Sequence, residues 1–159
     1  MDIHKATAAW MNNISPEQVT PEMRRQAKEV NFGVLYGMGE YGLSQRLNIS
    51  RARAKEFIEL YFSQFSRVKQ FIDEILKEAQ EKGYVTTIMG RKRPLPDILN
   101  KNFHIRSNAE RIAINTPIQG SAADLMKKAM ISVHQMLKKE NFHAKMIMQV
   151  HDELVFEVS

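Results

Sequence analysis

Cysteine is absent from the 159 residues of this sequence. Disulfide frameworks and thiolate zinc sites are therefore excluded, and a reducing cytoplasm is the expected compartment. The sequence also lacks any apolar run long enough to span a bilayer, and residues 1–5 lead into no apolar block of the kind that signal peptides carry. We therefore expect a cytoplasmic protein without a membrane partner.

Acidic residues are fewer than basic ones, since the chain has 18 Asp and Glu and 23 Lys and Arg. A formal net charge of +5 weakly favours polyanionic partners such as nucleic acid. Hydrophobic residues make up 43% of the chain, which is enough to fill the core of one domain of this length. The composition thus indicates a folded domain rather than a disordered one.

A helix is predicted to begin near Pro21, and within it Arg24, Lys28, Phe32 and Tyr36 recur at every fourth position. Each step of four residues drifts by only about 40°, so these side chains share one face over about 18 Å. Two cations followed by two aromatic rings suit a ligand with a polyanionic end and a flat apolar end. By spacing alone, the pattern is more typical of a half-buried aromatic face beside a solvated basic rim, and only the rest of the chain reverses that preference.

The remaining elements follow from apolar spacing and from turn residues. They are a helix over 2–11 with no cap before it, a break near Gly37, a short helix over 41–47, a helix capped by Ser50, a second helix ended by Gly83, a β-prone run over 84–88 with a turn at Gly90, a loop over 97–103, a helical stretch over 105–137 interrupted at Pro117, and two β-prone runs over 144–150 and 153–158. This order predicts an α+β fold.

A second polar row, Arg111, Asn115 and Gln119, falls at the same spacing of four residues. Such a row is most often a wet helix face, but these three side chains are also what a surface touching base edges needs. The basic run 91–93 is typical of a solvated turn and could also touch a nucleic-acid backbone. The core side of the long helical stretch is predicted from an apolar row, namely Leu125, Ala129, Val133 and Leu137.

The last two β-prone runs are separated by His151 and Asp152 and therefore predict a hairpin. His-Asp is a poor sequence for a two-residue turn, and a charged, locally unfavourable turn suggests a functional role. Asp152 and Glu153 would lie at its tip, where they offer the hard oxygen ligands that Mg²⁺ takes.

Three blocks of sequence, residues 24–37, 111–124 and 149–153, together resemble the fingers and palm motifs of family A DNA polymerases, the family of bacterial DNA polymerase I. The blocks contain Arg-x-x-x-Lys-x-x-x-Phe-x-x-x-Tyr-Gly, then Arg-x-x-x-Asn-x-x-x-Gln-Gly-x-Ala-Ala-Asp, then Gln-Val-His-Asp-Glu, and the resemblance extends over essentially the whole chain. Asp2-Ile3-His4 also matches the segment that precedes the fingers in this family. The one departure inside the motifs is Ser121, where the family usually has Thr.

The resemblance implies a mostly helical fingers subdomain over 1–100, then two long helices and a β-hairpin from part of the palm over 101–159. It implies template-directed transfer of a nucleotide from a dNTP to the 3′-hydroxyl of primer-template DNA, with two Mg²⁺ ions, in DNA replication and repair. The implied nucleotide-binding residues are His4, Arg24, Lys28, Phe32 and Tyr36, and Lys28 is also the implied proton donor to pyrophosphate. The implied DNA-binding residues are Arg111, Asn115, Gln119 and His151, and the implied catalytic metal ligands are Asp152 and Glu153.

The resemblance also implies a second catalytic aspartate, a thumb and exonuclease regions that this sequence does not match. We therefore expect weak metal binding and no polymerisation by the isolated chain, and association or partial disorder near residues 143–159. A non-catalytic module that binds DNA or dNTP, and an inert scaffold, are the alternatives. A metal phosphohydrolase built on His151 and Asp152 is disfavoured, because that pair lies between β-prone runs rather than on helices.

Overall fold

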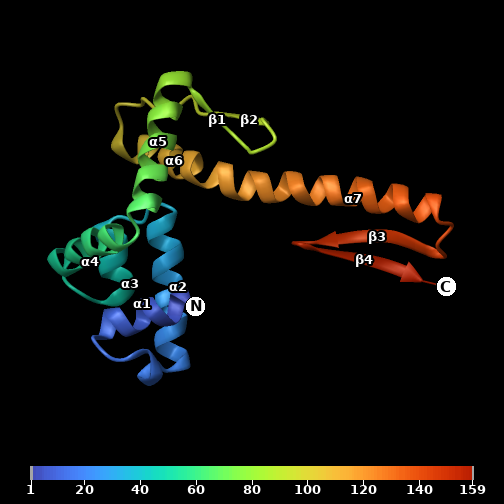
Figure 1. The fold of residues 1–159 in the computed structure, drawn as a ribbon. Helices are drawn as coiled ribbons and strands as arrows, with labels where there is room; N and C mark the ends of the chain where they lie inside the picture. Colours follow the sequence, from blue (N-terminus) through green and yellow to red (C-terminus); the bar gives the residue numbers. More distant parts are fainter. Residues whose placement is uncertain (1, 159) are drawn as a thin grey trace.

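The computed structural model describes residues 2–158 and shows a mostly helical α+β chain with two small antiparallel hairpins (Figure 1). Its elements, in chain order, are α1 (Ile3–Asn12), the 3-10 turn η1 (Pro16–Gln18), α2 (Pro21–Leu35), α3 (Glu40–Leu47), α4 (Arg51–Gln64), α5 (Ser66–Lys82), β1 (Tyr84–Thr86), β2 (Lys92–Pro94), α6 (Phe103–Asn115), the π-helical turn η2 (Thr116–Gly120), α7 (Ser121–Lys139), β3 (Ala144–Val150) and β4 (Glu153–Val158). The predicted α+β class is confirmed.

The first two long helices both begin at side-chain caps. Thr20 accepts a backbone N–H at the start of α2 and Pro21 takes the first helical position, so the predicted start of this helix is confirmed. The expectation that the first helix lacks a cap was wrong. Asp2 has extended backbone and accepts the N–H groups of His4 and Lys5 at 3.0 and 3.1 Å, so Asp2 is the N-cap of α1 rather than its first residue.

Helices α2, α3 and α4 pack around one buried cluster in the lower left of Figure 1. The chain turns between α2 and α3 at Gly37, whose φ of +86° favours glycine, and the break predicted there is confirmed. Ser50 caps α4 as predicted. The buried members of the cluster are Val30, Val34, Leu43, Ala54 and Tyr61.

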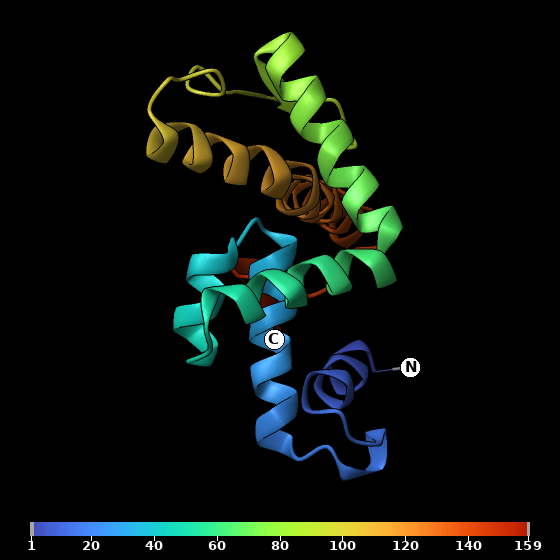
Figure 2. The same ribbon diagram turned by 90° about the vertical axis from the view of Figure 1, so that its left-hand side faces the viewer.

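A second buried cluster joins α5, the β1–β2 hairpin (the first hairpin), the loop after it and α6. Figure 2 shows α5 and α6 in front of α7. Gly83 ends α5 with a φ of +74°, as predicted. The sequence did not predict β2, because Pro94 usually ends regular structure. Pro94 is instead the last residue of a short edge strand, a position where proline is tolerated. The cluster consists of Ala79, Val85, Leu95, Ile98, Ala109 and Ala113.

The predicted interruption at Pro117 is confirmed, since α6 and α7 abut through the π-helical turn η2. Proline lacks the N–H that a continuous helix needs and its ring crowds the preceding turn, which accounts for the interruption. The hydroxyl of Ser121 donates to the carbonyl of Pro117 and accepts the N–H of Ile88 at 2.9 Å. The first α7 residue is thereby tied both to η2 and to the first hairpin.

Asp124 anchors the first hairpin to the start of α7. Thr87 Oγ1 donates to its Oδ2 at 2.6 Å, and Arg91 Nε donates to its Oδ1 at 2.7 Å. Arg91 also donates through Nη2 to the carbonyl of Gly120 at 3.1 Å. The hydrogen bond from Thr87, followed by that from Arg91, holds the pKa of the Asp124 carboxyl below its ordinary value. We call Thr87, Arg91 and Asp124 the hairpin latch.

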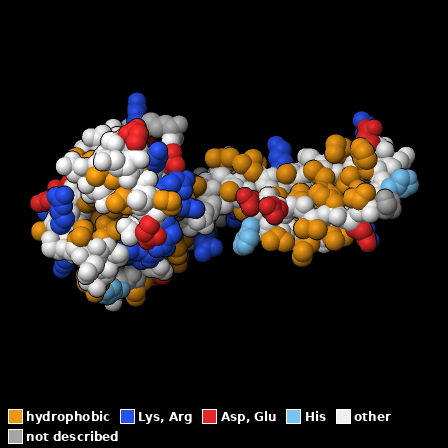
Figure 3. Space-filling model, turned by 90° about the horizontal axis from the view of Figure 1, so that it is seen from below, with side chains coloured by type: hydrophobic (Ala, Val, Ile, Leu, Met, Phe, Trp, Pro, Cys, Tyr) orange, Lys and Arg blue, Asp and Glu red, His pale blue; other side chains and the backbone are white. Residues whose placement is uncertain are grey.

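Helix α7 and the β3–β4 hairpin form an arm, residues 121–158, that extends away from the helical body (Figure 1). The apolar row predicted as the core side of α7 was wrong for this chain, because Leu125 is 51% exposed and Ala129 is exposed, while Val133 and Leu137 are half-buried. The hairpin runs alongside the C-terminal half of α7 (Figure 1), and Leu125 and Ile131 of this helix remain 51% and 60% exposed. Hydrophobic side chains accordingly gather on the surface of the arm in Figure 3.

Among residues 2–158, no helix combines the length and the hydropathy needed to cross a bilayer.

Candidate nucleotide and DNA site

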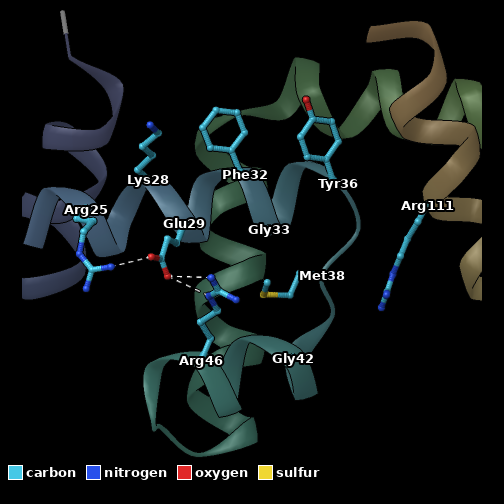
Figure 4. Close-up of a pocket in the computed structure, with 10 residues that line it drawn as sticks. All are labelled: Arg25, Lys28, Glu29, Phe32, Gly33, Tyr36, Met38, Gly42, Arg46 and Arg111. Atoms are coloured by element: carbon cyan, nitrogen blue, oxygen red, sulfur yellow. Dashed lines mark hydrogen bonds and ion pairs between the residues drawn. The ribbon is translucent and has the colours of Figure 1, made fainter. Parts of the chain in front are cut away.

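The predicted row on α2 projects into solvent rather than into the core. Lys28, Phe32 and Tyr36 extend from the same side of the helix (Figure 4), and the rings of Phe32 and Tyr36 stack with centroids 6.2 Å apart. Phe32 is 43% exposed, whereas the buried side of α2 is formed by Ala27, Val30, Asn31 and Val34. The half-core interpretation is thereby excluded for Phe32. A stacked aromatic pair beside a lysine, with Phe32 exposed and Tyr36 half-buried, is available to a flat ligand that carries negative charge.

Arg24, the first member of the row, is held by the cap of the preceding helix. Its Nε donates to Asp2 Oδ2 at 2.6 Å. This hydrogen bond, together with the backbone N–H of Lys5, lowers the pKa of Asp2 to about 2. Asp2 therefore carries a full negative charge at neutral pH and fixes one edge of the guanidinium. Arg24 makes no ion pair with any other residue in the described range 2–158.

His4 is brought to the same row by α1. Its Nδ1 accepts from Asn31 Nδ2 at 2.9 Å, and its ring centroid lies 5.8 Å from that of Phe32. An amide nitrogen only donates, so the neutral imidazole carries its proton on Nε2. The structure thus places His4 beside the aromatic part of the row, in a tautomer that can donate a hydrogen bond to a ligand.

A hollow of about 740 Å³ lies between α2, α3 and α6 (Figure 4). It contains Lys28, Phe32 and Tyr36 of the predicted row and Arg111 of the second row. The sequence had not singled out its other lining residues. They are Arg25, Glu29, Gly33, Met38, Gly42 and Arg46.

Glu29 neutralises two of the cations around this hollow. Its Oε1 lies 3.1 Å from Arg25 and its Oε2 lies 3.0 Å from Arg46, so that it joins α2 to α3 (Figure 4). Lys28, by contrast, makes no ion pair with any residue between 2 and 158. The charge of Lys28 is therefore available to a ligand. The spacing of Arg25 and Glu29 was a signal that could have revealed the network, since it is the i, i+4 spacing of helical ion pairs.

The second predicted row divides between two places. Arg111 lines the hollow beside α2, whereas Asn115 and Gln119 line a smaller cavity of about 280 Å³ at η2, together with Arg91 and Arg93 of the first hairpin. Arg111 and Asn115 both belong to α6, so the division falls within that helix, whereas Asn115 and Gln119, on either side of the start of η2, stay in one cavity. Asn115 Oδ1 is buried and has no hydrogen-bond partner in the described part of the chain.

His151 and Asp152 form the predicted hairpin turn, which points back toward the helical body in Figure 1. His151 has a φ of +53°, and its carbonyl accepts from Gln149 Nε2 at 2.9 Å. Asp152 and Glu153 are exposed neighbours. No cluster of three possible metal ligands occurs within residues 2–158. Mg²⁺ is usually held by one or two carboxylates and takes its other ligands from water and substrate phosphates, so Asp152 and Glu153 are the carboxylates that this turn could offer to such an ion.

Comparison with known proteins decides the family. The sequence matches DNA polymerase family A over residues 1–159. The chain belongs to DNA polymerase family A. Ser121, where the family usually has Thr, keeps the hydroxyl that bonds to Pro117 and Ile88, so this departure leaves the local structure intact.

Relatives within family A match nearly all of this chain. It is 57% identical over 157 residues to the DNA polymerase I of Bacillus caldotenax and 50% identical over 157 residues to the thermostable DNA polymerase I of Thermus filiformis. These matches cover 99% of this chain but only 18% and 19% of the two relatives. A solved structure, the POL domain of Pol1 from M. smegmatis in complex with DNA primer-template and dNTP, superposes with a TM-score of 0.89 at 43% identity, over 98% of this chain and 28% of that one.

Proposed function

We propose that this chain supplies the nucleotide-binding and primer-contacting part of a DNA polymerase that transfers nucleotides from dNTPs to a primer 3′-hydroxyl in DNA replication and repair. In this proposal residues 1–100 are the fingers subdomain and residues 101–159 are part of the palm. The observation that carries the proposal is the solvent-facing row on α2, with two cations, two stacked aromatic rings and His4 beside them. The M. smegmatis relative, which binds primer-template DNA and dNTP, supports it.

The α2 row is assigned to the incoming nucleotide. Arg24 and Lys28 bind the triphosphate oxygens, and His4 donates to the same group from Nε2. Phe32 packs against the sugar and base, and Tyr36 occupies the place where the template base enters. Lys28, which has no carboxylate partner in the described residues, donates a proton to the departing pyrophosphate.

Arg111, Asn115, Gln119 and His151 are assigned to the minor groove of the primer-template duplex. Minor-groove acceptors occupy nearly the same places in every Watson–Crick pair, so contacts there test the shape of a pair without reading its sequence. Asn115 suits this role because its buried atom is Oδ1, which leaves the donor Nδ2 for the groove. A copying enzyme requires this kind of sequence-independent contact.

Asp152 and Glu153 are assigned to a metal site that other segments of the longer polymerase complete. The isolated chain is therefore proposed to bind primer-template DNA or dNTP without catalysis. This non-catalytic binding module is the second candidate function. Lys28, which forms no ion pair within residues 2–158, lies beside the exposed ring of Phe32, and this is the feature that suits binding of a nucleotide by the isolated chain.

The exposed apolar surface of the arm suggests that the isolated chain self-associates. Ile131, Met136 and Ile147 are 60%, 50% and 55% exposed, and surfaces of this kind are usually covered in a folded protein. Sedimentation of the chain over a range of concentrations measures the association. A single monomeric species at every concentration would contradict it.

Replacing Phe32 with Tyr tests the nucleotide assignment. The measurement uses Bacillus caldotenax DNA polymerase I with its matching segment replaced by this chain, which we call the chimeric polymerase. A Tyr hydroxyl can take the place of a missing 3′-hydroxyl, and a hydrogen bond of about 1.4 kcal/mol changes a ratio about tenfold. The ratio of dideoxynucleotide to deoxynucleotide incorporation is therefore expected to rise about tenfold.

The matched control for this test is Phe103→Tyr, which adds the same hydroxyl to a ring that is 64% exposed at the start of α6. The control should leave the incorporation ratio unchanged. An unchanged ratio in the Phe32 variant as well would refute the placement of Phe32 against the sugar.

A further inference from the structure

The basic run Arg91, Lys92 and Arg93 contains three cations in three different environments. Arg91 belongs to the hairpin latch, since it bonds to Asp124 and to the carbonyl of Gly120. The ammonium of Lys92 lies 4.6 Å from the ring centroid of Tyr84. Arg93 makes no ion pair with any residue in the described part of the chain. The run is therefore not a uniformly solvated turn, and Arg93 is its member with neither an ion pair nor a ring contact in the described residues.

The register of the first hairpin determines where Arg93 lies. Arg93 pairs with Val85, and directly paired residues of an antiparallel ladder share one face. Val85 is fully buried against the cluster that contains α6, so Arg93 lies on the α6 side of the hairpin. Lys92 pairs with Thr86 and lies on the opposite face. Two neighbouring cations of the same run are thus separated by the pleat of a single strand.

Arg93 shares the 280 Å³ cavity at η2 with Asn115 and Gln119. No Asp or Glu lines this cavity, so the charge around it is positive only. The buried, unpartnered Oδ1 of Asn115 also lies in its wall, which leaves the amide donors of Asn115 and Gln119 for a ligand. An arginine beside amide donors, without a competing carboxylate, suits a ligand that carries a phosphate next to hydrogen-bond acceptors.

We propose that Arg93 binds a backbone phosphate of the duplex whose minor-groove edge contacts Asn115 and Gln119. The proposal rests on the proposed function and deepens it by adding a DNA-binding residue from the first hairpin. Phosphates border the minor groove, so one cavity can hold a groove-edge contact and a phosphate contact of the same strand. Arg91 does not bind DNA in this arrangement. It is a positioning residue that keeps the hairpin, and with it Arg93, against η2.

A phosphate contact fixes the register of a duplex without reading its sequence. Arg93 would therefore hold the duplex at a fixed distance from Gln119 while leaving the copied sequence free to vary. The latch fixes the position of this contact, because Arg91 of the hairpin donates hydrogen bonds both to Asp124 and to the carbonyl of Gly120.

The test measures binding of a fluorescent primer-template duplex to the chimeric polymerase as a function of KCl concentration. Loss of one phosphate contact reduces the slope of log K against log salt by about 0.9. Arg93→Gln is expected to show this change and to weaken binding equally for duplexes of different sequence. Arg93→Lys should restore most of the slope, because it keeps the charge. Lys92→Gln, which removes the same charge from the opposite face, is the matched control and should change the slope by less than half as much.

The same titration separates failure of this proposal from failure of the proposed function. Arg93→Gln and Lys92→Gln could give the same slope of log K against log salt while Gln119→Ala still weakens binding. That result would overturn the role of Arg93 and leave the proposed function standing. If Gln119→Ala and Arg93→Gln both bind like the unsubstituted chimeric polymerase, neither residue contacts DNA and both proposals fail. An unfolding temperature equal to that of the unsubstituted chimeric polymerase shows that a variant is folded.

Discussion

Lys28→Ala is expected to lower the single-turnover rate of nucleotide incorporation by the chimeric polymerase ~10²–10⁴-fold, the usual contribution of a positioned general acid. Lys28 extends from α2 on the same side as Phe32 (Figure 4). Arg24, Arg25 and Arg46 are each bonded to a carboxylate, whereas Lys28 makes no ion pair with any residue that the structure describes. Its ammonium is therefore the group at this site that is available both to bind phosphate oxygens and to give up a proton.

The variant Lys28→Arg separates these two roles. A guanidinium keeps the positive charge but does not release its proton at any accessible pH. We expect Lys28→Arg to bind dNTP within a few-fold of the unsubstituted chimeric polymerase while its incorporation rate remains close to that of Lys28→Ala. Lys55→Ala, which removes an exposed lysine paired with Glu59 on α4, is the control for loss of charge and should leave the rate unchanged. A normal rate in Lys28→Arg would show that Lys28 acts through its charge alone.

Thr87→Val is expected to destabilise the chain by roughly 1–3 kcal/mol, the cost of leaving a buried hydrogen-bonding group without its partner. Thr87 is 4% exposed and donates to Asp124 at 2.6 Å across 37 residues of sequence. The substitution preserves the shape of the side chain and removes only the hydroxyl. Thr86→Val is the matched control, because Thr86 is the half-buried last residue of β1, directly before Thr87, and makes no side-chain hydrogen bond within residues 2–158. It should change stability by less than about 0.5 kcal/mol.

The effect of Thr87→Val should also depend on pH. The folded-state pKa of Asp124 lies below its ordinary value of 3.8, so the latch contributes its full stability above that pH and loses it as the pH falls through the folded pKa. The difference in the free energy of unfolding between the unsubstituted chain and Thr87→Val should therefore be constant from pH 7 to about pH 5. It should shrink below about pH 4. Urea unfolding at several pH values measures it. A difference that grows as the pH falls would contradict the role of the Asp124 carboxylate.

The local structure of this chain could be predicted where short-range signals agree. Thr20 and Pro21 mark the start of α2, Ser50 caps α4, and Gly83 ends α5 through its left-handed backbone. The spacing of Lys28, Phe32 and Tyr36 correctly placed all three on one side of α2. Each of these signals acts within about one helical turn, and this is the range over which sequence patterns are most informative.

The features that could not be predicted depend on contacts between distant segments. Nothing near Asp124 in the sequence indicates that it receives hydrogen bonds from Thr87 and Arg91, which are 37 and 33 residues away. The division of the second row between two cavities depends on which distant segments lie beside it, because Arg111 lines a hollow with α2 and α3 whereas Asn115 and Gln119 line a cavity with Arg91 and Arg93. The apolar row containing Leu125 has the periodicity of a core face, but periodicity does not show whether a partner is present in the chain.

The central claim is that this chain carries the nucleotide-binding and DNA-binding side chains of a family A polymerase but only part of the metal site. The most direct test is primer extension by the isolated chain with Mg²⁺ and all four dNTPs, beside a salt titration of primer-template binding. The account predicts binding that weakens steeply with salt, and no extension. Extension would contradict it, because some other carboxylate of this chain would then have to complete the metal site together with Asp152 and Glu153.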